Sequence, residues 1–186
     1  MDSNNEKFLM DQISATLFSL ANKIQAEGDK QYKRLTSRQL MALVAIAHLE
    51  EEKTTINNIA KKLGTTKQSA QQLVNTLKKQ EFVEIVPSKE DKRAVNVKIT
   101  DYGKQTMIDE YSSGVKFNAY VFKDFSVEEM QILWCLLKKL YRFDGREQDG
   151  LEGDVNIKFS SEQIEEGNKA LKEAEAIREQ GKNRSK

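Results

Sequence analysis

The sequence predicts a mainly α-helical fold with one small β-hairpin, and three observations support this prediction. The 186-residue chain contains one proline and nine glycines, so few positions interrupt a helix. Apolar residues recur at spacings of three and four along most of its length. Two segments, residues 82–86 and 95–99, instead alternate apolar and polar residues, as strands do.

The first predicted helix covers residues 6–27, where Met10, Ile13, Leu17 and Ile24 form one apolar stripe. Gly28 is a plausible end for this helix. The stripe must be buried against another helix. That helix can belong to the same chain or to a second copy, and the pattern does not distinguish between them.

The second helix has a clear start, because Thr36 and Gln39 are spaced as a capping box. A third, short helix covers residues 56–63, with Thr55 as its cap, and Gly64 follows as a turn residue. A fourth helix runs to Gln80, capped by Thr65 or Thr66. Small residues lie where the third and fourth helices would cross, namely Ala60, Gly64 and Ala70. This order is typical of a helix-turn-helix.

The outer face of the fourth helix carries amides and lysines, and no acidic residue lies between Gly64 and Gln80. Amide side chains can bond base edges, and lysines can contact phosphates. The alternative is an ordinary solvated face, but such faces usually mix both charge signs. We therefore predict DNA contacts by Thr66, Lys67, Gln68, Gln71, Gln72, Asn75, Lys78 and Lys79.

The two predicted strands enclose a basic tip, residues 87–93. Lys89, Lys92 and Arg93 supply its cations, and an arginine on such a tip can enter a minor groove. Asp91 is placed to hold the Arg93 guanidinium. A plain solvated loop is the alternative for an isolated hairpin. Next to a helix-turn-helix, the hairpin is better interpreted as a wing.

Two long helices follow the hairpin. Thr100 caps the first, to about residue 122, and a capping box at Ser126 and Glu129 opens the second, to about Tyr141. The apolar stripe of the first is predicted to be Met107, Ile108, Tyr111, Val115 and Phe122. With residues 6–27, these helices exceed what a small winged domain can cover, so we expect a dimer.

Charge and composition divide the chain further. Residues 55–100 hold nine Lys or Arg against four Asp or Glu, a net of +5, whereas residues 144–186 hold eight against eleven, a net of −3. The predicted division is an N-terminal dimerisation helix (1–34), a winged helix-turn-helix domain (35–100), C-terminal dimerisation helices (101–143) and an acidic linker and tail (144–186). The tail is expected to be partly helical, over residues 160–180, or disordered.

Taken together, these features resemble the MarR family of bacterial transcription regulators. The resemblance rests on Asp91-Lys92-Arg93 and on Ile99-Thr100-x-x-Gly103, with Leu35-Thr36, Ile59-Ala60-x-x-Leu63-Gly64 and Leu73-Val74-x-x-Leu77. It implies a homodimer with a recognition helix in each major groove, here residues 66–80, and wings in the flanking minor grooves. It also implies regulation by a small ligand or an oxidant. Glutamines and lysines stand where the family often has arginine, and nothing in the family accounts for the tail.

Other function classes have little support in the sequence. No signal pattern, no run of about 18 apolar residues and a single cysteine lead to a cytoplasmic expectation. There is no catalytic constellation, so we expect neither an enzyme nor a cofactor or metal. His48 is interpreted as a surface or capping residue, and Cys135 as a buried, inert thiol among apolar neighbours. Tyr32, Phe18 and Met41 are candidates for lining a ligand pocket, although such residues are more often plain core.

The predicted function is that of a homodimeric, sequence-specific DNA-binding transcription regulator, a repressor on a palindromic operator that a small ligand releases. The alternative is a protein-interaction scaffold that keeps the winged fold without reading DNA, which the long tail would favour.

Overall fold

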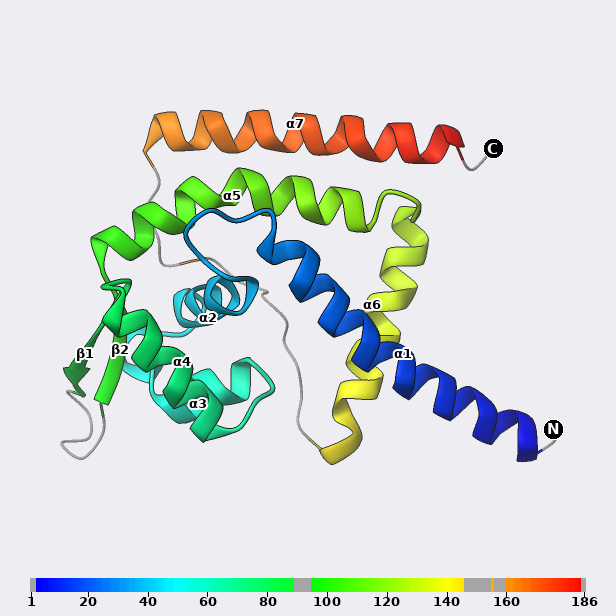
Figure 1. Ribbon diagram of the computed structural model, residues 1–186, viewed down its shortest axis with the longest axis horizontal. Helices are drawn as coiled ribbons and strands as arrows, with labels where there is room; N and C mark the ends of the chain where they lie inside the picture. Colours follow the sequence, from blue (N-terminus) through cyan, green and yellow to red (C-terminus); the bar gives the residue numbers. More distant parts are fainter. Residues whose placement is uncertain (1–2, 89–94, 146–154, 156–159, 185–186) are drawn as a thin grey trace.

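A long central helix organises the structure. The structure is a computed structural model, and it describes all residues except 1–2, 89–94, 146–154, 156–159 and 185–186. This helix, α5 (Asp101–Val121), follows a small winged domain at one end and leads to the projecting helix α6 (Val127–Tyr141) at the other (Figure 1). The winged domain contains α2 (Ser37–Ala47), the 3-10 helix η1 (Glu51–Lys53), α3 (Ile56–Lys62), α4 (Lys67–Lys79), β1 (Val83–Pro87) and β2 (Val95–Ile99). The remaining elements are α1 (Ser3–Asp29), α6 (Val127–Tyr141), η2 (Arg142–Asp144) and α7 (Ser161–Arg184).

The core of the chain lies inside the winged domain. Leu43 of α2, Ile59 of α3 and Leu77 of α4 have no exposed surface, and Val97 of β2 closes the core from the hairpin side. The helix-spaced apolar positions of three short helices therefore meet one face of a two-stranded sheet. The predicted mainly α fold with one β-hairpin wing is confirmed.

Side-chain caps begin the helices where the sequence predicts them. The Thr36 hydroxyl accepts from the Gln39 backbone N–H at 3.2 Å, and the Gln39 side chain accepts from the Thr36 N–H at 2.8 Å. Ser126 and Glu129 form the second predicted capping box. Of the two candidates before α4, the cap is Thr66. These reciprocal bonds satisfy helix N–H groups that would otherwise lack partners.

The hairpin is antiparallel, with Val83 opposite Ile99 and Pro87 opposite Val95. It turns directly into α5 at Thr100, whose hydroxyl accepts from the Gly103 N–H at 3.0 Å and donates to the Glu81 carbonyl at 2.6 Å. One threonine thus caps α5 and fastens it to the connection that follows α4, so the hairpin, α4 and the long helix share a junction.

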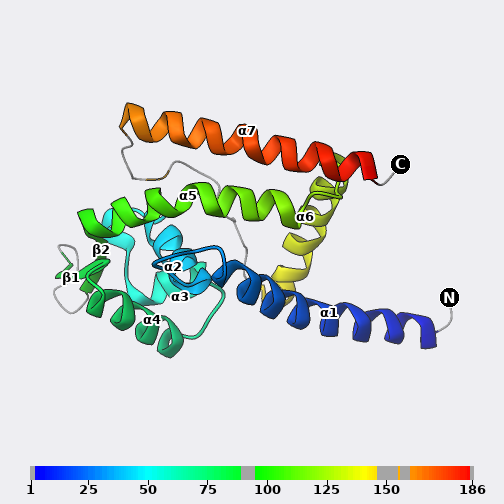
Figure 2. The ribbon, with the colours of Figure 1, turned by 45° about the horizontal axis from the view of Figure 1, so that its top comes forward.

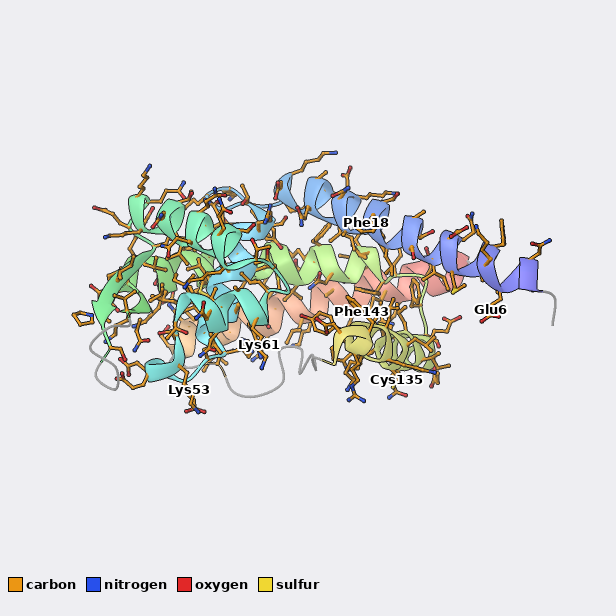
Figure 3. The ribbon with its side chains drawn as sticks, turned by 90° about the horizontal axis from the view of Figure 1, so that it is seen from below. Glu6, Phe18, Lys53, Lys61, Cys135 and Phe143 are labelled. Carbon is orange, nitrogen blue, oxygen red and sulfur yellow. The ribbon has the colours of Figure 1, made fainter. Side chains whose placement is uncertain are left out.

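The apolar faces of α1 and α6 are not covered within one chain. Phe18 on α1 is 77% exposed and Phe143, after α6, is 87% exposed. None of the α6 residues is buried. In Figures 1 and 3, α1 projects beyond the rest of the molecule, with Glu6 near its outer end. This arrangement leaves two long amphipathic helices with apolar surface to bury.

The C-terminal helix α7 packs along α5 and runs in the same direction (Figures 1 and 2). Of the two expectations for the tail, a helix over residues 160–180 or disorder, the structure has the helix, which runs from Ser161 to Arg184. Ala170 and Ala174 form its buried side. Among the described helices, none has a long enough apolar stretch to cross a bilayer.

The predicted apolar stripe of α5 is only partly buried: Met107, Ile108, Val115 and Phe122 are half-buried, Met107 packs against the core, and Tyr111 is exposed. The buried residues of α5 include Thr106, Glu110 and Phe117. Glu110 can be buried because its carboxylate accepts from the backbone N–H groups of Lys33 and Arg34, both at 3.0 Å. A buried carboxylate with two such donors closes the connection between α1 and α2.

Candidate nucleic-acid interface

The turn between α3 and α4 has the backbone that a helix-turn-helix requires. Gly64 adopts φ +61°, a left-handed conformation that side chains rarely tolerate. Ala60 and Ala70 are buried on either side of it. A Cβ atom at Gly64 would also lie 3.1 Å from the hydroxyl oxygen of Tyr141, at the end of α6. The turn therefore needs glycine both for its conformation and for its packing.

The inner face of α4 holds the helix against the core. Ala70, Val74 and Leu77 are buried and Leu73 is half-buried. These positions fix the rotation of the helix about its axis, so the polar residues between them must face outward.

The outer face of α4 presents most of the residues that the sequence proposes for DNA contact. Gln71 is half-buried and donates from its amide nitrogen to the Asn75 side-chain oxygen at 3.2 Å. This bond holds two amides in a fixed relation one turn apart. The other proposed residues are exposed: Thr66, Lys67, Gln68, Gln72, Asn75, Lys78 and Lys79.

The charge on this face has one sign. Lys78 and Lys79 lie in the last turn of α4, and Lys61 in the last turn of α3. No carboxylate interrupts residues 65–80. An exposed surface of amides and ammonium groups suits a polyanion with hydrogen-bonding base edges.

The far end of α4 is tied to the start of α2. The Gln39 amide donates to the Gln80 side-chain oxygen at 2.6 Å, and Gln39 itself is buried. Gln39 therefore has a second role beside the capping box, which its position in the sequence did not indicate. The contact fixes the orientation of α4 relative to α2.

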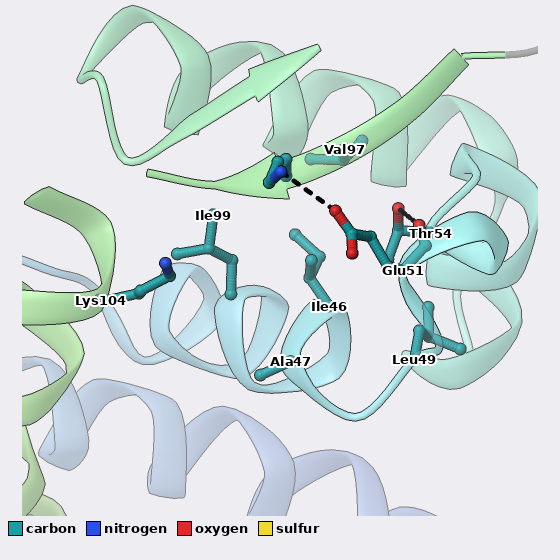
Figure 4. Close-up of a pocket in the computed structure, with 9 residues that line it drawn as sticks. Ile46, Ala47, Leu49, Glu51, Thr54, Val97, Ile99 and Lys104 are labelled. Atoms are coloured by element: carbon teal, nitrogen blue, oxygen red, sulfur yellow. Dashed lines mark hydrogen bonds and ion pairs between the residues drawn. The ribbon is translucent and has the colours of Figure 1, made fainter. Parts of the chain in front are cut away.

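The basic tip of the hairpin, with Lys89, Asp91, Lys92 and Arg93, lies outside the described residues. Its base is anchored to η1 (Figure 4). Lys98 pairs with Glu51 at 3.0 Å, and the Val97 N–H donates to the Thr54 carbonyl at 3.0 Å. The hydrogen bond to Glu51 raises the pKa of Lys98 above its usual value.

A cavity of about 400 Å³ lies beside the winged domain, between α1, α2 and α5. Tyr32 and Met41, two of the three suggested pocket residues, line it, but Phe18 does not. Burial raises the pKa of the Tyr32 phenol, and the nearby carboxylates of Glu110 and Asp29 raise it further. The walls are mostly apolar, as is typical of small-molecule sites.

The interpretation of His48 as a capping residue agrees with the structure, whereas that of Cys135 as a buried thiol does not. His48 follows α2 as its C-cap, with its Nδ1 2.9 Å from the Val44 carbonyl oxygen, which agrees with the capping interpretation. The prediction for Cys135 is wrong, since this thiol is exposed in the single chain (Figure 3). Its apolar neighbours lie on the uncovered helix α6. Within the described part of the chain, no three His, Cys, Asp or Glu side chains are grouped to hold a metal ion.

Residues 35–94 match the model of the MarR family. The fold is shared with a MarR/EmrR family transcriptional regulator from Acinetobacter sp. ADP1, at 20% identity and a TM-score of 0.64, covering 71% of this chain and 94% of that one. It is shared with MepR of S. aureus in a DNA complex, at 19% identity, 69% and 94% coverage and a TM-score of 0.63. It is also shared with CouR of Rhodococcus jostii RHA1 bound to p-coumaroyl-CoA, at 16% identity, 72% and 94% coverage and a TM-score of 0.61. None of the curated proteins compared with the chain matches it.

Proposed function

We propose that this chain, a MarR-family protein by its winged helix at residues 35–94 and by its fold, is a DNA-binding transcription regulator that represses from a palindromic operator. One observation carries the proposal. The outer face of α4 is exposed and polar, free of carboxylates and fixed in its rotation by a buried inner face. MepR, which shares the fold, was solved in a complex with DNA, and this supports DNA binding by a protein of this fold.

In this proposal α4 enters the major groove. Gln68, Gln72 and Asn75 contact base edges, and Lys67, Lys78 and Lys79 contact phosphates. Thr66 and Gln71 complete the surface at its start and at its edge. The hairpin adds Lys89, Lys92 and an Arg93 that enters the flanking minor groove, with Asp91 supporting the arginine.

The regulator acts as a homodimer. The uncovered apolar faces of α1 and α6 support this, because helices of 27 and 15 residues with exposed Phe, Ile, Leu and Trp side chains are costly in water. A two-fold dimer places two copies of α4 about one DNA turn apart. The expected operator is therefore a palindrome.

A small ligand releases the regulator from DNA, and the cavity beside Tyr32 and Met41 is its proposed site. The cavity lies between α2 of the winged domain, the dimer helix α1, and α5, which leads to the dimer helix α6. A ligand there would change how the winged domain sits on α5. CouR, solved with p-coumaroyl-CoA, is an example of a ligand-bound protein with this fold.

The test is a selection of bound sequences from a random DNA pool, followed by fluorescence anisotropy on the selected site. Gln72→Ala is expected to cost about 1–3 kcal/mol and to relax specificity at one base pair. Lys78→Ala is expected to weaken binding to all sequences and to reduce the slope of log K against log salt by about 1. The control is Lys172→Ala, which removes one positive charge from an exposed face of α7. It should change neither the DNA affinity nor the slope of log K against log salt.

Arg93→Ala tests the wing in the same assay and is expected to cost about 1–3 kcal/mol. Unchanged binding would remove the wing from the mechanism. If the DNA affinity of the wild-type protein does not change with salt concentration, DNA recognition is contradicted altogether. That result would favour the alternative, a protein-interaction scaffold built on the α7 extension.

A further inference from the structure

The helix α7 is attached to α5 along its length, beginning near its start, where the Gln163 amide donates to the Gln105 side-chain oxygen at 3.3 Å. Ala170 and Ala174 are buried against α5, and Glu173 pairs with Lys116. Farther along, the Arg178 guanidinium donates to the Phe125 carbonyl at 2.7 Å, at the turn between α5 and α6. These contacts fix the axis of α7 along its neighbour.

The first half of α7 leaves a space over α5. A cavity of about 370 Å³ opens there, within the size range of small-molecule sites, roughly 300–1,000 Å³. Ile108 and Tyr111 of α5 form one apolar wall, and Ile164 and Leu171 of α7 form the other. Tyr111, Ile164 and Leu171 are 45–53% exposed, so the site has apolar surface still in contact with water.

The charged groups that line this cavity are carboxylates. Asp109 and Glu166 are among the lining residues, and no Lys or Arg of the described chain joins them. Asp109 already accepts from Arg34 at 3.3 Å and from Gln105 at 2.8 Å. Glu166 makes no hydrogen bond or ion pair with any residue that the structure describes, so its charge is available to a ligand.

From the apolar walls and the available carboxylate, we propose that the α5–α7 cavity binds an amphipathic monocation. Its apolar part lies on Tyr111, Ile164 and Leu171, and its cationic head lies beside Glu166. The site goes beyond the proposed function, since it requires neither DNA nor release from DNA. Ile108 and Tyr111 also line the cavity beside Tyr32, so the two sites share a wall and occupancy of one is positioned to affect the other.

The test is isothermal titration calorimetry of the full chain with decyltrimethylammonium and with decyl sulfate, both kept below micelle-forming concentrations. The two probes share a decyl chain and differ in the charge of the head. The cation is expected to bind at least tenfold more tightly than the anion. Glu166→Gln should weaken binding of the cation about two- to fivefold, as removal of one exposed carboxylate does.

Three variants locate the binding. Glu165→Gln removes the adjacent exposed carboxylate, which does not line the cavity, and should leave affinity unchanged. Ser112→Leu fills the α5–α7 cavity and should abolish binding, whereas Met41→Trp fills only the other cavity and should not.

Equal affinity for the two probes, or equal effects of Glu166→Gln and Glu165→Gln, would overturn the proposal. Loss of binding in Met41→Trp with retention in Ser112→Leu would also overturn it, because the ligand would then occupy the other cavity. If Ser112→Leu fails to fold, the pair of glutamate variants still decides the matter. DNA binding is measured separately, so failure here leaves the proposed function untouched.

Discussion

Gly103→Ala is the substitution whose effect follows most directly from the geometry. A Cβ atom at this position would lie 2.1 Å from the Phe82 carbonyl oxygen and 3.0 Å from Cγ2 of Ile99. The first distance is more than 1 Å too short, and the obstacle is backbone rather than a flexible side chain. The same carbonyl accepts from the Thr100 N–H at 3.1 Å, so it cannot move without straining the junction of hairpin and helix.

The expected loss of stability combines three terms. Overpacking in a tight site costs about 1–3 kcal/mol, and a strained junction hydrogen bond costs about 1 kcal/mol more. Alanine returns about 1 kcal/mol through its higher helix propensity. The net loss is about 1–3 kcal/mol. For a chain of this size each kcal/mol lowers Tm by roughly 2–4 °C, so the variant should melt about 2–12 °C below the wild type.

Gly114→Ala in the same helix is the matched control, since the nearest atom to its added Cβ would be the Tyr32 hydroxyl oxygen at an ordinary 3.4 Å. This variant should be as stable as the wild type or up to about 1 kcal/mol more stable. Urea and thermal unfolding are compared at one protein concentration, because a dimer's stability depends on it. Equal stability of the two alanine variants would show that the close approach to Phe82 does not dictate glycine at position 103.

Three further predictions concern single side chains. Thr36→Ala removes the cap of α2 and the partner of Gln39, and should cost about 1 kcal/mol in urea unfolding. The pKa of the Tyr32 phenol is raised, so Tyr32 should ionise above pH 10.0. The difference in tyrosinate absorbance between the wild type and Tyr32→Phe measures this ionisation. The contribution of neutral Tyr32 to stability should be lost as the pH rises above 10.0 and the phenol ionises. The hydrogen bond from Lys116 lowers the pKa of Glu173. The contribution of this ion pair to folding stability is therefore present above the ordinary pKa of 4.5 and is lost as the pH falls below it. In Lys116→Ala, the NMR titration midpoint of the Glu173 carboxyl should rise.

The parts of the fold that could be predicted are those with local signals. A capping box joins residues only three positions apart, so Thr36 with Gln39 and Ser126 with Glu129 could be identified without any tertiary information. The left-handed Gly64 is similarly local, because a turn of two helices requires that backbone. The caps give the starts of α2 and α6, Gly64 gives the turn between α3 and α4, and the apolar spacing of Ala70, Val74 and Leu77 gives the rotation of α4 and hence its outward face.

The rest depends on partners that lie far away in the sequence. Burial of Glu110 requires the backbone N–H groups of Lys33 and Arg34, more than 70 positions earlier, and no periodicity reveals such a bond. The buried side of α7 consists of Ala170 and Ala174, which contribute little to an apolar pattern. The error on Cys135 has a different origin. Its apolar neighbours do predict a buried face, but a single chain does not supply the surface that would cover it.

Contacts that hold α4 on three sides restrict how a ligand could change DNA binding. Gln80, after α4, is bonded to Gln39 of α2, the turn before α4 lies against Tyr141, and the Thr100 hydroxyl ties the connection after α4 to α5. Each contact reaches a different element, and α2 and α5 both line the cavity beside Tyr32. Bending α4 would break several of these contacts, whereas rotating the winged domain as one body about the start of α5 preserves its packed core. In the proposed dimer, a ligand would therefore act by changing the separation of the two recognition helices, with the amide surface of each left intact.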